Sequence, residues 1–120
     1  MWASLVFGFA LLLQLVDKTA QAPLPHPAAD LTPEKRGDIY MARKMYREGV
    51  EAYQQALRAD PKSAMLYNKI GIAHHQQLQL DLAQRYYERA IKLDKNYPEA
   101  VNNLGTIFYA RRGYRRAISQ

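Results

Sequence analysis

Few side chains in this sequence could perform catalytic or metal chemistry. The 120 residues include no cysteine and only three histidines, which removes disulfides, thiolate zinc sites and cysteine nucleophiles. His74 and His75 are adjacent, and adjacent residues of a helix point about 100° apart, so they cannot chelate one ion as a pair spaced by four could. Glu88 and Asp94 are too isolated in the sequence to form a catalytic pair. We therefore predict that the protein is not an enzyme and has no metal site and no cofactor.

Basic side chains are the other group that could bind a ligand. The formal net charge is +6, and four arginines stand close together at residues 111, 112, 115 and 116. Such an excess permits binding to nucleic acid or to an anionic lipid surface through phosphate contacts. We keep this as an alternative function and disfavour nucleic acid as the partner. No glycine-rich phosphate loop follows a strand pattern, which is a further argument against an enzyme.

The N-terminal segment has the pattern of an export signal. Residues 2–16 are almost entirely apolar, would span only about 22 Å as a helix, and are followed by an Ala-Gln-Ala site at residues 20–22. We predict that residues 1–22 are a signal peptide and that the protein is exported, periplasmic or secreted. Two features depart from the pattern of a signal peptide. No Lys or Arg precedes the apolar run, and Pro23 directly follows the expected cleavage site after residue 22. The alternative is an uncleaved, short membrane anchor through residues 2–16.

Residues 23–30 form the predicted spacer that follows. Three prolines fall within these eight residues, and each fixes its own φ angle and lacks an N–H group. We expect an extended, Pro-rich spacer in which His26 is exposed and without a chemical role.

The rest of the sequence repeats with a period of 34 residues. Gly37, Gly71 and Gly105 are spaced by this period, and so are the small residues Gly49, Ala83 and Ala117. Tyr53 pairs with Tyr87 in the same way, and Ala56 pairs with Ala90. A fixed period of this length is typical of proteins built from stacked structural repeats.

Within each period the apolar residues recur at steps of three and four, which indicates helices. Thr32 before Pro33 is a typical helix start, and Pro61 should break the chain between two units. We predict helices over residues 33–43, 46–59, 63–77, 80–93 and 98–111, and a further helix from 114 onward. We expect Gly71 to let a neighbouring helix approach closely, so that a larger side chain there would overpack the contact.

With these residues, the sequence resembles the tetratricopeptide repeat (TPR) family, a helix–turn–helix unit of 34 residues. The resemblance implies an all-α fold of antiparallel helix–turn–helix repeats stacked as a short right-handed solenoid. Its repeats would be residues 30–63, 64–97 and 98–120, the last one incomplete. It departs from the family pattern at Lys95, where proline is usual. The structural repeat positions would be Gly37, Gly49, Ala56, Gly71, Ala83, Tyr87, Ala90, Gly105, Phe108 and Ala117.

The resemblance also implies a function, which is to bind a protein or peptide in the concave groove formed by the first helix of each repeat. The implied groove residues are Met65, Asn68, Ile72, His75, Gln76, Asn102, Thr106 and Tyr109. Asn68 and Asn102 occupy the same repeat position, and their amides could bond the backbone of an extended segment. Some members of the family clamp the carboxylate at the C-terminus of heat-shock chaperones. We expect no such clamp here, because Glu34 and Asp38 would repel a carboxylate.

The incomplete third repeat raises a further expectation. Each unit buries its apolar face mainly against its neighbours, so residues 98–110 should expose apolar surface. We hypothesise that the chain is a truncated version of a longer array. Self-association through this third repeat is a further alternative function.

Overall fold

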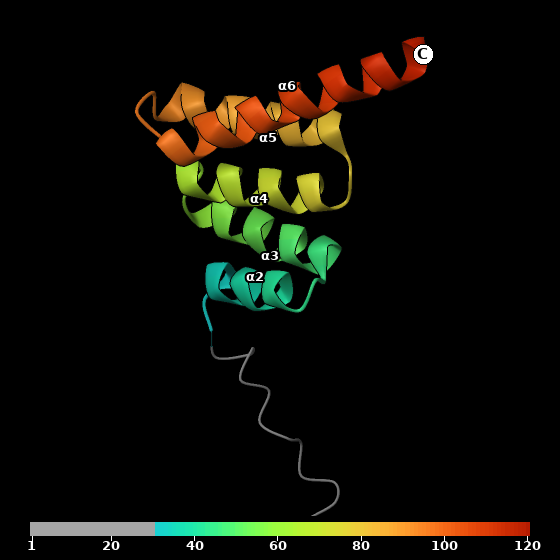
Figure 1. Ribbon diagram of the computed structural model, residues 1–120. Coiled ribbons are helices and arrows are strands. Elements are labelled where there is room, and N and C mark those ends of the chain that lie inside the picture. The colour runs from blue at the N-terminus through green and yellow to red at the C-terminus, as the bar shows by residue number, and fades with distance from the viewer. Residues whose placement is uncertain (1–30) are drawn as a thin grey trace, which may run out of the picture. The chain divides into compact units, whose positions relative to one another are not determined.

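The computed structural model describes residues 31–120, which are drawn in colour in Figure 1. The predicted signal peptide, spacer and exposed His26 lie outside the described residues. In residues 31–120 the structure contains five α-helices and no strand, which confirms the all-α class. None of these helices is both long and apolar enough to cross a bilayer. They are α2 (Pro33–Ala42), α3 (Tyr46–Ala59), α4 (Ala64–Gln76), α5 (Leu80–Leu93) and α6 (Pro98–Ser119).

The sequence determines where the first helices begin and end. The Thr32 hydroxyl accepts a hydrogen bond of 3.3 Å from the Lys35 backbone N–H, which caps α2 as predicted. Ser63 caps α4 in the same way, accepting from the backbone N–H of Leu66 at 3.3 Å. α3 ends at Ala59, directly before the predicted break at Pro61.

Tight turns join the two helices of each pair, and both use a residue with positive φ. Lys44 follows α2 with a φ of 60°, and Leu78 follows α4 with a φ of 59°. A left-handed conformation costs a non-glycine residue about 1–2 kcal/mol. The packing of α3 against α2, and of α5 against α4, offsets that cost.

The core lies between these helices and has two parts. The first cluster consists of Val50, Tyr53, Ala56, Leu66, Ile70 and Ala73. The second consists of Ala83, Tyr87 and Ile107, with Ile72, Leu80 and Leu104 packed against it. The first cluster joins α3 to α4, and the second joins α5 to α6, so each helix pair is fixed to the next one.

Glycine and tyrosine meet at the centre of each helix pair. A Cβ atom on Gly71 would lie 2.6 Å from the Tyr87 ring, and one on Gly37 would also collide with the Tyr53 ring. Both tyrosines are almost fully buried. The ring therefore lies directly on the backbone of the facing helix, which confirms that Gly71 allows the close approach.

The predicted turn near Gly113 is wrong. α6 runs without interruption from Pro98 to Ser119, and no glycine of the described residues has a positive φ. The position equivalent to Leu78 is Arg112, which stays helical. Tyr114 and Ile118 are 55% and 85% exposed, so no packing in residues 31–120 would offset a left-handed residue at this point. The continuous helix keeps its backbone hydrogen bonds instead.

Candidate functional site

The first helix of each pair contributes to one candidate binding surface. α4 contacts both α2 and α6, through Lys69 and Asn68 respectively. We call the surface of α2, α4 and α6 that carries the predicted groove residues the first-helix face. Of those residues, Met65, Gln76, Asn102, Thr106 and Tyr109 are exposed, and Ile72 and His75 are half-buried.

Asn68 is the exception among the predicted groove residues. It is only 1% exposed, and its amide oxygen accepts a hydrogen bond of 3.1 Å from Nδ2 of Asn103 on α6. Asn102, at the equivalent repeat position, remains exposed. A buried amide must find its partner inside the protein, and Asn68 does so by joining α4 to α6. We therefore remove Asn68 from the candidate groove.

Both helical histidines contact other side chains of the protein. Nδ1 of His74 lies 2.7 Å from Oε1 of Gln79, and its ring stacks on Tyr86 with centroids 5.3 Å apart. Nδ1 of His75 lies 3.3 Å from the Tyr87 hydroxyl. Within residues 31–120, no group of three His, Asp or Glu residues could hold a metal ion. The two rings contribute to packing between α4 and α5.

An ionic cluster occupies the N-terminal end of the first-helix face. Nζ of Lys69 lies 2.9 Å from a carboxylate oxygen of Glu34 and 2.9 Å from one of Asp38. The Tyr53 hydroxyl donates a hydrogen bond of 2.6 Å to the same Asp38 oxygen. The one lysine of this cluster is therefore held between two carboxylates, which leaves the cluster with a net negative charge.

The cluster changes the proton affinities of its members. Burial lowers the pKa of Lys69, but its hydrogen bonds to Asp38 and Glu34 outweigh that effect, so the pKa lies above its ordinary value. Burial raises the pKa of the Tyr53 phenol strongly, and the hydrogen bond to Asp38 raises it further. Lys69 is thus charged and Tyr53 neutral throughout the physiological range.

A hollow of about 300 Å³ lies beside this cluster, where α2 begins, α3 ends and α4 begins. Glu34 and Met65 belong to its lining, together with Pro33, Ala56 and Leu66. Met65 is 44% exposed, so its thioether can contact a ligand from this position. Methionine suits such a role because its flexible side chain adapts to irregular apolar surfaces.

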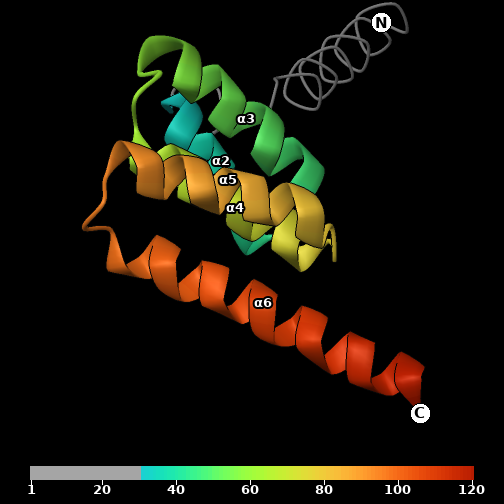
Figure 2. The ribbon, with the colours of Figure 1, turned by 90° about the horizontal axis from the view of Figure 1, so that it is seen from above.

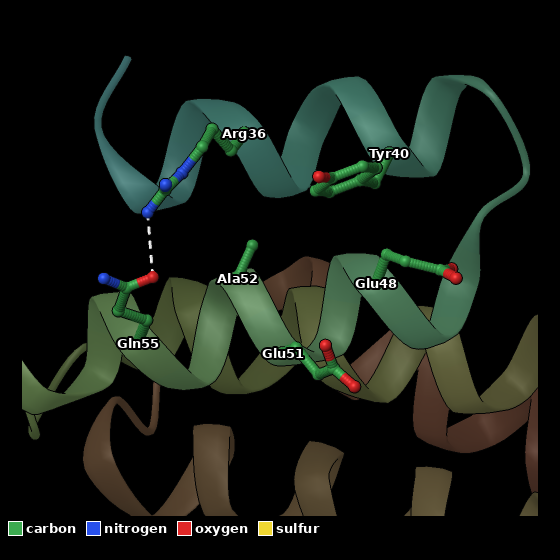
Figure 3. Close-up of a pocket in the computed structure, with 6 residues that line it drawn as sticks. All are labelled: Arg36, Tyr40, Glu48, Glu51, Ala52 and Gln55. Atoms are coloured by element: carbon green, nitrogen blue, oxygen red, sulfur yellow. Dashed lines mark hydrogen bonds between the residues drawn. The ribbon is translucent and has the colours of Figure 1, made fainter. Parts of the chain in front are cut away.

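A second hollow, of about 190 Å³, lies between α2 and α3 (Figure 3). Arg36, Tyr40, Glu48, Glu51, Ala52 and Gln55 line it. The Arg36 guanidinium donates a hydrogen bond of 2.8 Å to Oε1 of Gln55, while its buried Nε has no hydrogen-bond partner among residues 31–120. The lining mixes both signs of charge, so it favours no single class of ligand.

A third hollow, of about 320 Å³, lies between α4 and α5, at the place in the second helix pair that corresponds to the hollow between α2 and α3. It is lined by Tyr67, Leu82, Arg85, Tyr86 and Arg89, and the Arg89 guanidinium lies 5.8 Å from the Tyr67 ring centroid. Glu51 of the first pair thus corresponds to Arg85 of the second. The sequence analysis missed both hollows, although comparing the outer residues of α3 and α5 at the 34-residue period would have revealed the change of charge.

Two sequence models of one repeat family match this chain. The sequence model described as "TPR repeat" matches residues 37–77, and the one described as "Tetratricopeptide repeat" matches residues 70–120. The chain belongs to the tetratricopeptide repeat family. The matched segments together include all of α3, α4, α5 and α6 and most of α2. The glycine–tyrosine contacts of the two helix pairs are therefore features of two TPR units.

Similar proteins occur among both curated sequences and solved structures. The chain is 35% identical over 77 residues to an "Uncharacterized protein ycf37" of Guillardia theta, covering 60% of this chain and 43% of that protein. It is 37% identical over 70 residues to the "Photosystem I assembly protein Ycf3" of Cyanophora paradoxa, covering 55% and 40%. The first TPR of Spaghetti (RPAP3), solved with the HSP90 peptide SRMEEVD, matches with a TM-score of 0.63 and 26% identity, covering 67% and 64%.

The chain spans less than half the length of these two curated relatives. The solved relative was captured with a peptide bound, and the Cyanophora relative is described by its part in assembly. Family membership together with these relatives supports a TPR module for protein interaction.

Proposed function

We propose that this TPR module binds an extended or helical segment of another protein along the first-helix face. The observation that carries the proposal is an exposed stripe on α6. Asn102, Thr106 and Tyr109 recur at steps of four and three, all three are exposed, and Tyr109 is 82% exposed. A large aromatic side chain that ends in a hydroxyl group is typical of protein-binding surfaces.

Charge suggests which segments this face accepts. Glu34, Asp38 and Glu99 are acidic, and the nearby Lys69 is already paired with the first two. The peptide bound to the Spaghetti relative, SRMEEVD, is acidic. Such a segment would meet like charges here, so we propose that the face binds neutral or basic segments.

The relative described as an assembly protein suggests a biological setting. Its similarity to this chain covers only 70 residues, which are 55% of this chain and 40% of that protein. We therefore propose the general role, which is to hold a partner protein during assembly or recruitment, and leave the partner's identity to experiment.

A displayed library of random peptides would test the proposal. The wild-type protein should enrich a family of neutral or basic peptides, and a variant with Met65→Arg and Thr106→Arg should lose them. Gln54→Arg is the matched control, because it adds the same charge at an exposed position on α3, outside the first-helix face. SRMEEVD should not bind measurably.

Three results would contradict the proposal. The first is enrichment that Met65→Arg and Thr106→Arg leave unchanged, and the second is saturable binding of SRMEEVD to the first-helix face. The third would favour the alternative of a basic surface: binding of a DNA duplex or of anionic vesicles that falls steeply as salt is added, with no peptide enriched.

We also propose that the module acts after export, on the basis of the apolar run and the Ala-Gln-Ala site in residues 1–22. Mass spectrometry of the N-terminus of the membrane-associated and released protein would test this. A released protein that begins at Pro23 supports a cleaved signal peptide, and an uncleaved protein in the membrane fraction supports the anchor. An uncleaved protein in the cytoplasm would contradict both.

A further inference from the structure

The hollow of about 320 Å³ between α4 and α5 combines positive charge with an apolar lining. We call it the outer hollow, and the residues that line it are Tyr67, Leu82, Arg85, Tyr86 and Arg89. The two arginines stand four positions apart on α5, which places them about 6 Å apart along the helix axis. Both are exposed, so their guanidinium groups can reach a ligand at the protein surface.

The two arginines have no acidic partner in the part of the chain that the structure describes. No ion pair of residues 31–120 includes either of them. The acidic residues of α5 are engaged elsewhere. Asp81 pairs with Arg111 of α6, and the Glu88 carboxylate accepts a hydrogen bond of 2.7 Å from Gln84. Their positive charge is therefore available to an external carboxylate, which a guanidinium can bind through two parallel hydrogen bonds.

The apolar part of the lining favours an aromatic side chain. The rings of Tyr67 and Tyr86 lie 6.2 Å apart between centroids, and Leu82 is 37% exposed. The Arg89 guanidinium lies 5.8 Å from the Tyr67 ring centroid, so rings and positive charge meet at one place. A third ring in the hollow could pack against both tyrosines. A ligand with an aromatic side chain between acidic residues matches both parts of this lining.

The packing of the repeat does not require these side chains. The first helix pair has the same fold, and there the residues equivalent to Leu82, Arg85 and Arg89 are Glu48, Glu51 and Gln55, which lie 34 positions earlier. The exchange of two acidic residues for a leucine and an arginine changes the charge and leaves the helix pairing intact. The outer hollow is therefore a property of the second pair alone.

The outer hollow lies away from the side of α5 on which α6 packs. Leu80, Ala83 and Tyr87 of α5 pack with residues of α6, whereas Tyr86 packs against the core cluster that α3 shares with α4. In the view of Figure 2, α3 and α6 lie on opposite sides of α5. Because the pairs stack from α2 towards α6, a further helix pair would lie on the α6 side and leave the outer hollow open.

This chain does not contain a segment that matches the lining. No aromatic residue among its 120 has an acidic residue within two positions on both sides. The same sequence argues against a second copy that offers such a segment. A flat phosphate surface is also a poor match, because only two arginines line the hollow and the exposed Glu51 and Glu88 lie on the outer surfaces of α3 and α5.

We propose that the outer hollow binds a segment of a partner protein in which an aromatic side chain is flanked by acidic residues. The ring packs on Tyr67 and Tyr86, and the carboxylates pair with Arg85 and Arg89. This surface is separate from the first-helix face and prefers the opposite charge, so the module has two binding surfaces of different specificity. In the displayed library it would yield a separate acidic family, so the neutral or basic family alone tests the first-helix face.

A short peptide with this pattern is the most direct probe. Fluorescein-labelled, end-capped SDEFEDS should bind the full chain saturably in fluorescence anisotropy. SDEAEDS keeps the charge and lacks the ring, and it should bind about fivefold more weakly. SNQFNQS keeps the ring and lacks the charge, and it should bind about tenfold more weakly. The acidic peptide SRMEEVD contains no aromatic residue and should remain unbound.

Arginine variants locate the binding site. Arg85→Gln combined with Arg89→Gln should weaken SDEFEDS binding by about tenfold, because both charge-assisted contacts are lost. The matched control is Arg112→Gln combined with Arg116→Gln, which removes the same charge at the same spacing from exposed positions of α6. The control should bind within about twofold of the wild type. Leu82→Glu, which places a carboxylate in the lining, should also weaken binding, and equal thermal unfolding would establish that the folds are intact.

Several outcomes would overturn the inference. Absence of SDEFEDS binding at millimolar peptide would do so, as would equal affinities of SDEFEDS and SDEAEDS or equal losses in the two arginine pairs. Sedimentation at increasing protein concentration tests a second copy as the occupant. If the wild type dimerises and Arg85→Gln with Arg89→Gln is monomeric, the partner segment is rejected. Binding of phosphatidylglycerol vesicles or of a DNA duplex through these arginines, without peptide binding, would reject it as well.

Discussion

At the scale of single residues, two glycines at the same repeat position should respond in opposite ways to alanine. Gly71→Ala places a methyl group 2.6 Å from the buried Tyr87 ring and should lower the free energy of unfolding by about 1–3 kcal/mol. Gly105→Ala adds the same group in open space, and alanine favours a helix over glycine by about 1 kcal/mol, so this variant should be more stable. Urea denaturation measures both. Equal effects of the two substitutions would contradict the packing described for Gly71.

The buried phenols make stability depend on alkaline pH. Burial raises the pKa of Tyr53 and of Tyr87 in the folded state, so above about pH 10 the unfolded chain loses these protons first. The unfolded state then binds fewer protons than the native state, and stability falls as pH rises. Lys69, whose pKa is also raised, acts in the same direction.

One variant can assign the loss of stability at alkaline pH to a particular buried phenol. We expect the free energy of unfolding to fall between about pH 9 and about pH 11, and to fall less steeply in Tyr87→Phe, which keeps the ring over Gly71. Tyr46→Phe, at a half-buried phenol with no hydrogen bond to a side chain in residues 31–120, is a control. The assignment fails if Tyr87→Phe and the wild type lose stability in parallel.

At the scale of elements, one pair of amides holds α6 to α4. Asn103→Ala removes the donor that Asn68 needs and leaves a buried amide oxygen without a partner, which should cost about 1–3 kcal/mol of stability. Asn102→Ala, at an exposed neighbour on the same helix, should change stability by less than about 0.5 kcal/mol. Thermal unfolding followed by circular dichroism distinguishes them. Similar losses in both variants would mean that the amide pair does not join the helices.

Local sequence patterns predict some of the helix boundaries and miss others. The cap at Thr32 and the breaks between the first four helices depend on neighbouring residues, and local patterns predicted them, whereas the cap at Ser63 was not predicted. The turn expected near Gly113 depends on whether a following helix packs back on α6, which no local pattern contains. Lys44 and Leu78 adopt positive φ although neither is glycine, whereas Gly113 remains helical. Packing rather than residue type decides where a turn forms.

At the scale of the whole molecule, the 34-residue period predicted the stacking of the pairs because it repeats the residues that must be small. It could not predict the candidate site equally well. Asn68 and Asn102 share a repeat position, yet one is buried and the other exposed, because Asn103 lies against only the first. The period could not predict the ionic cluster either, because Lys69 contacts two carboxylates that lie 35 and 31 residues earlier in the sequence.

The central claim is that this TPR module binds another protein along its first-helix face. The most direct test is to titrate the peptide most enriched from the library into isotopically labelled protein and to map the amide shifts by NMR. The account predicts that the largest shifts fall at Met65, Thr106 and Tyr109, and that the outer residues of α3 and α5, such as Glu51 and Arg85, do not respond. Shifts confined to those outer residues, with Met65 and Thr106 unchanged, would contradict it.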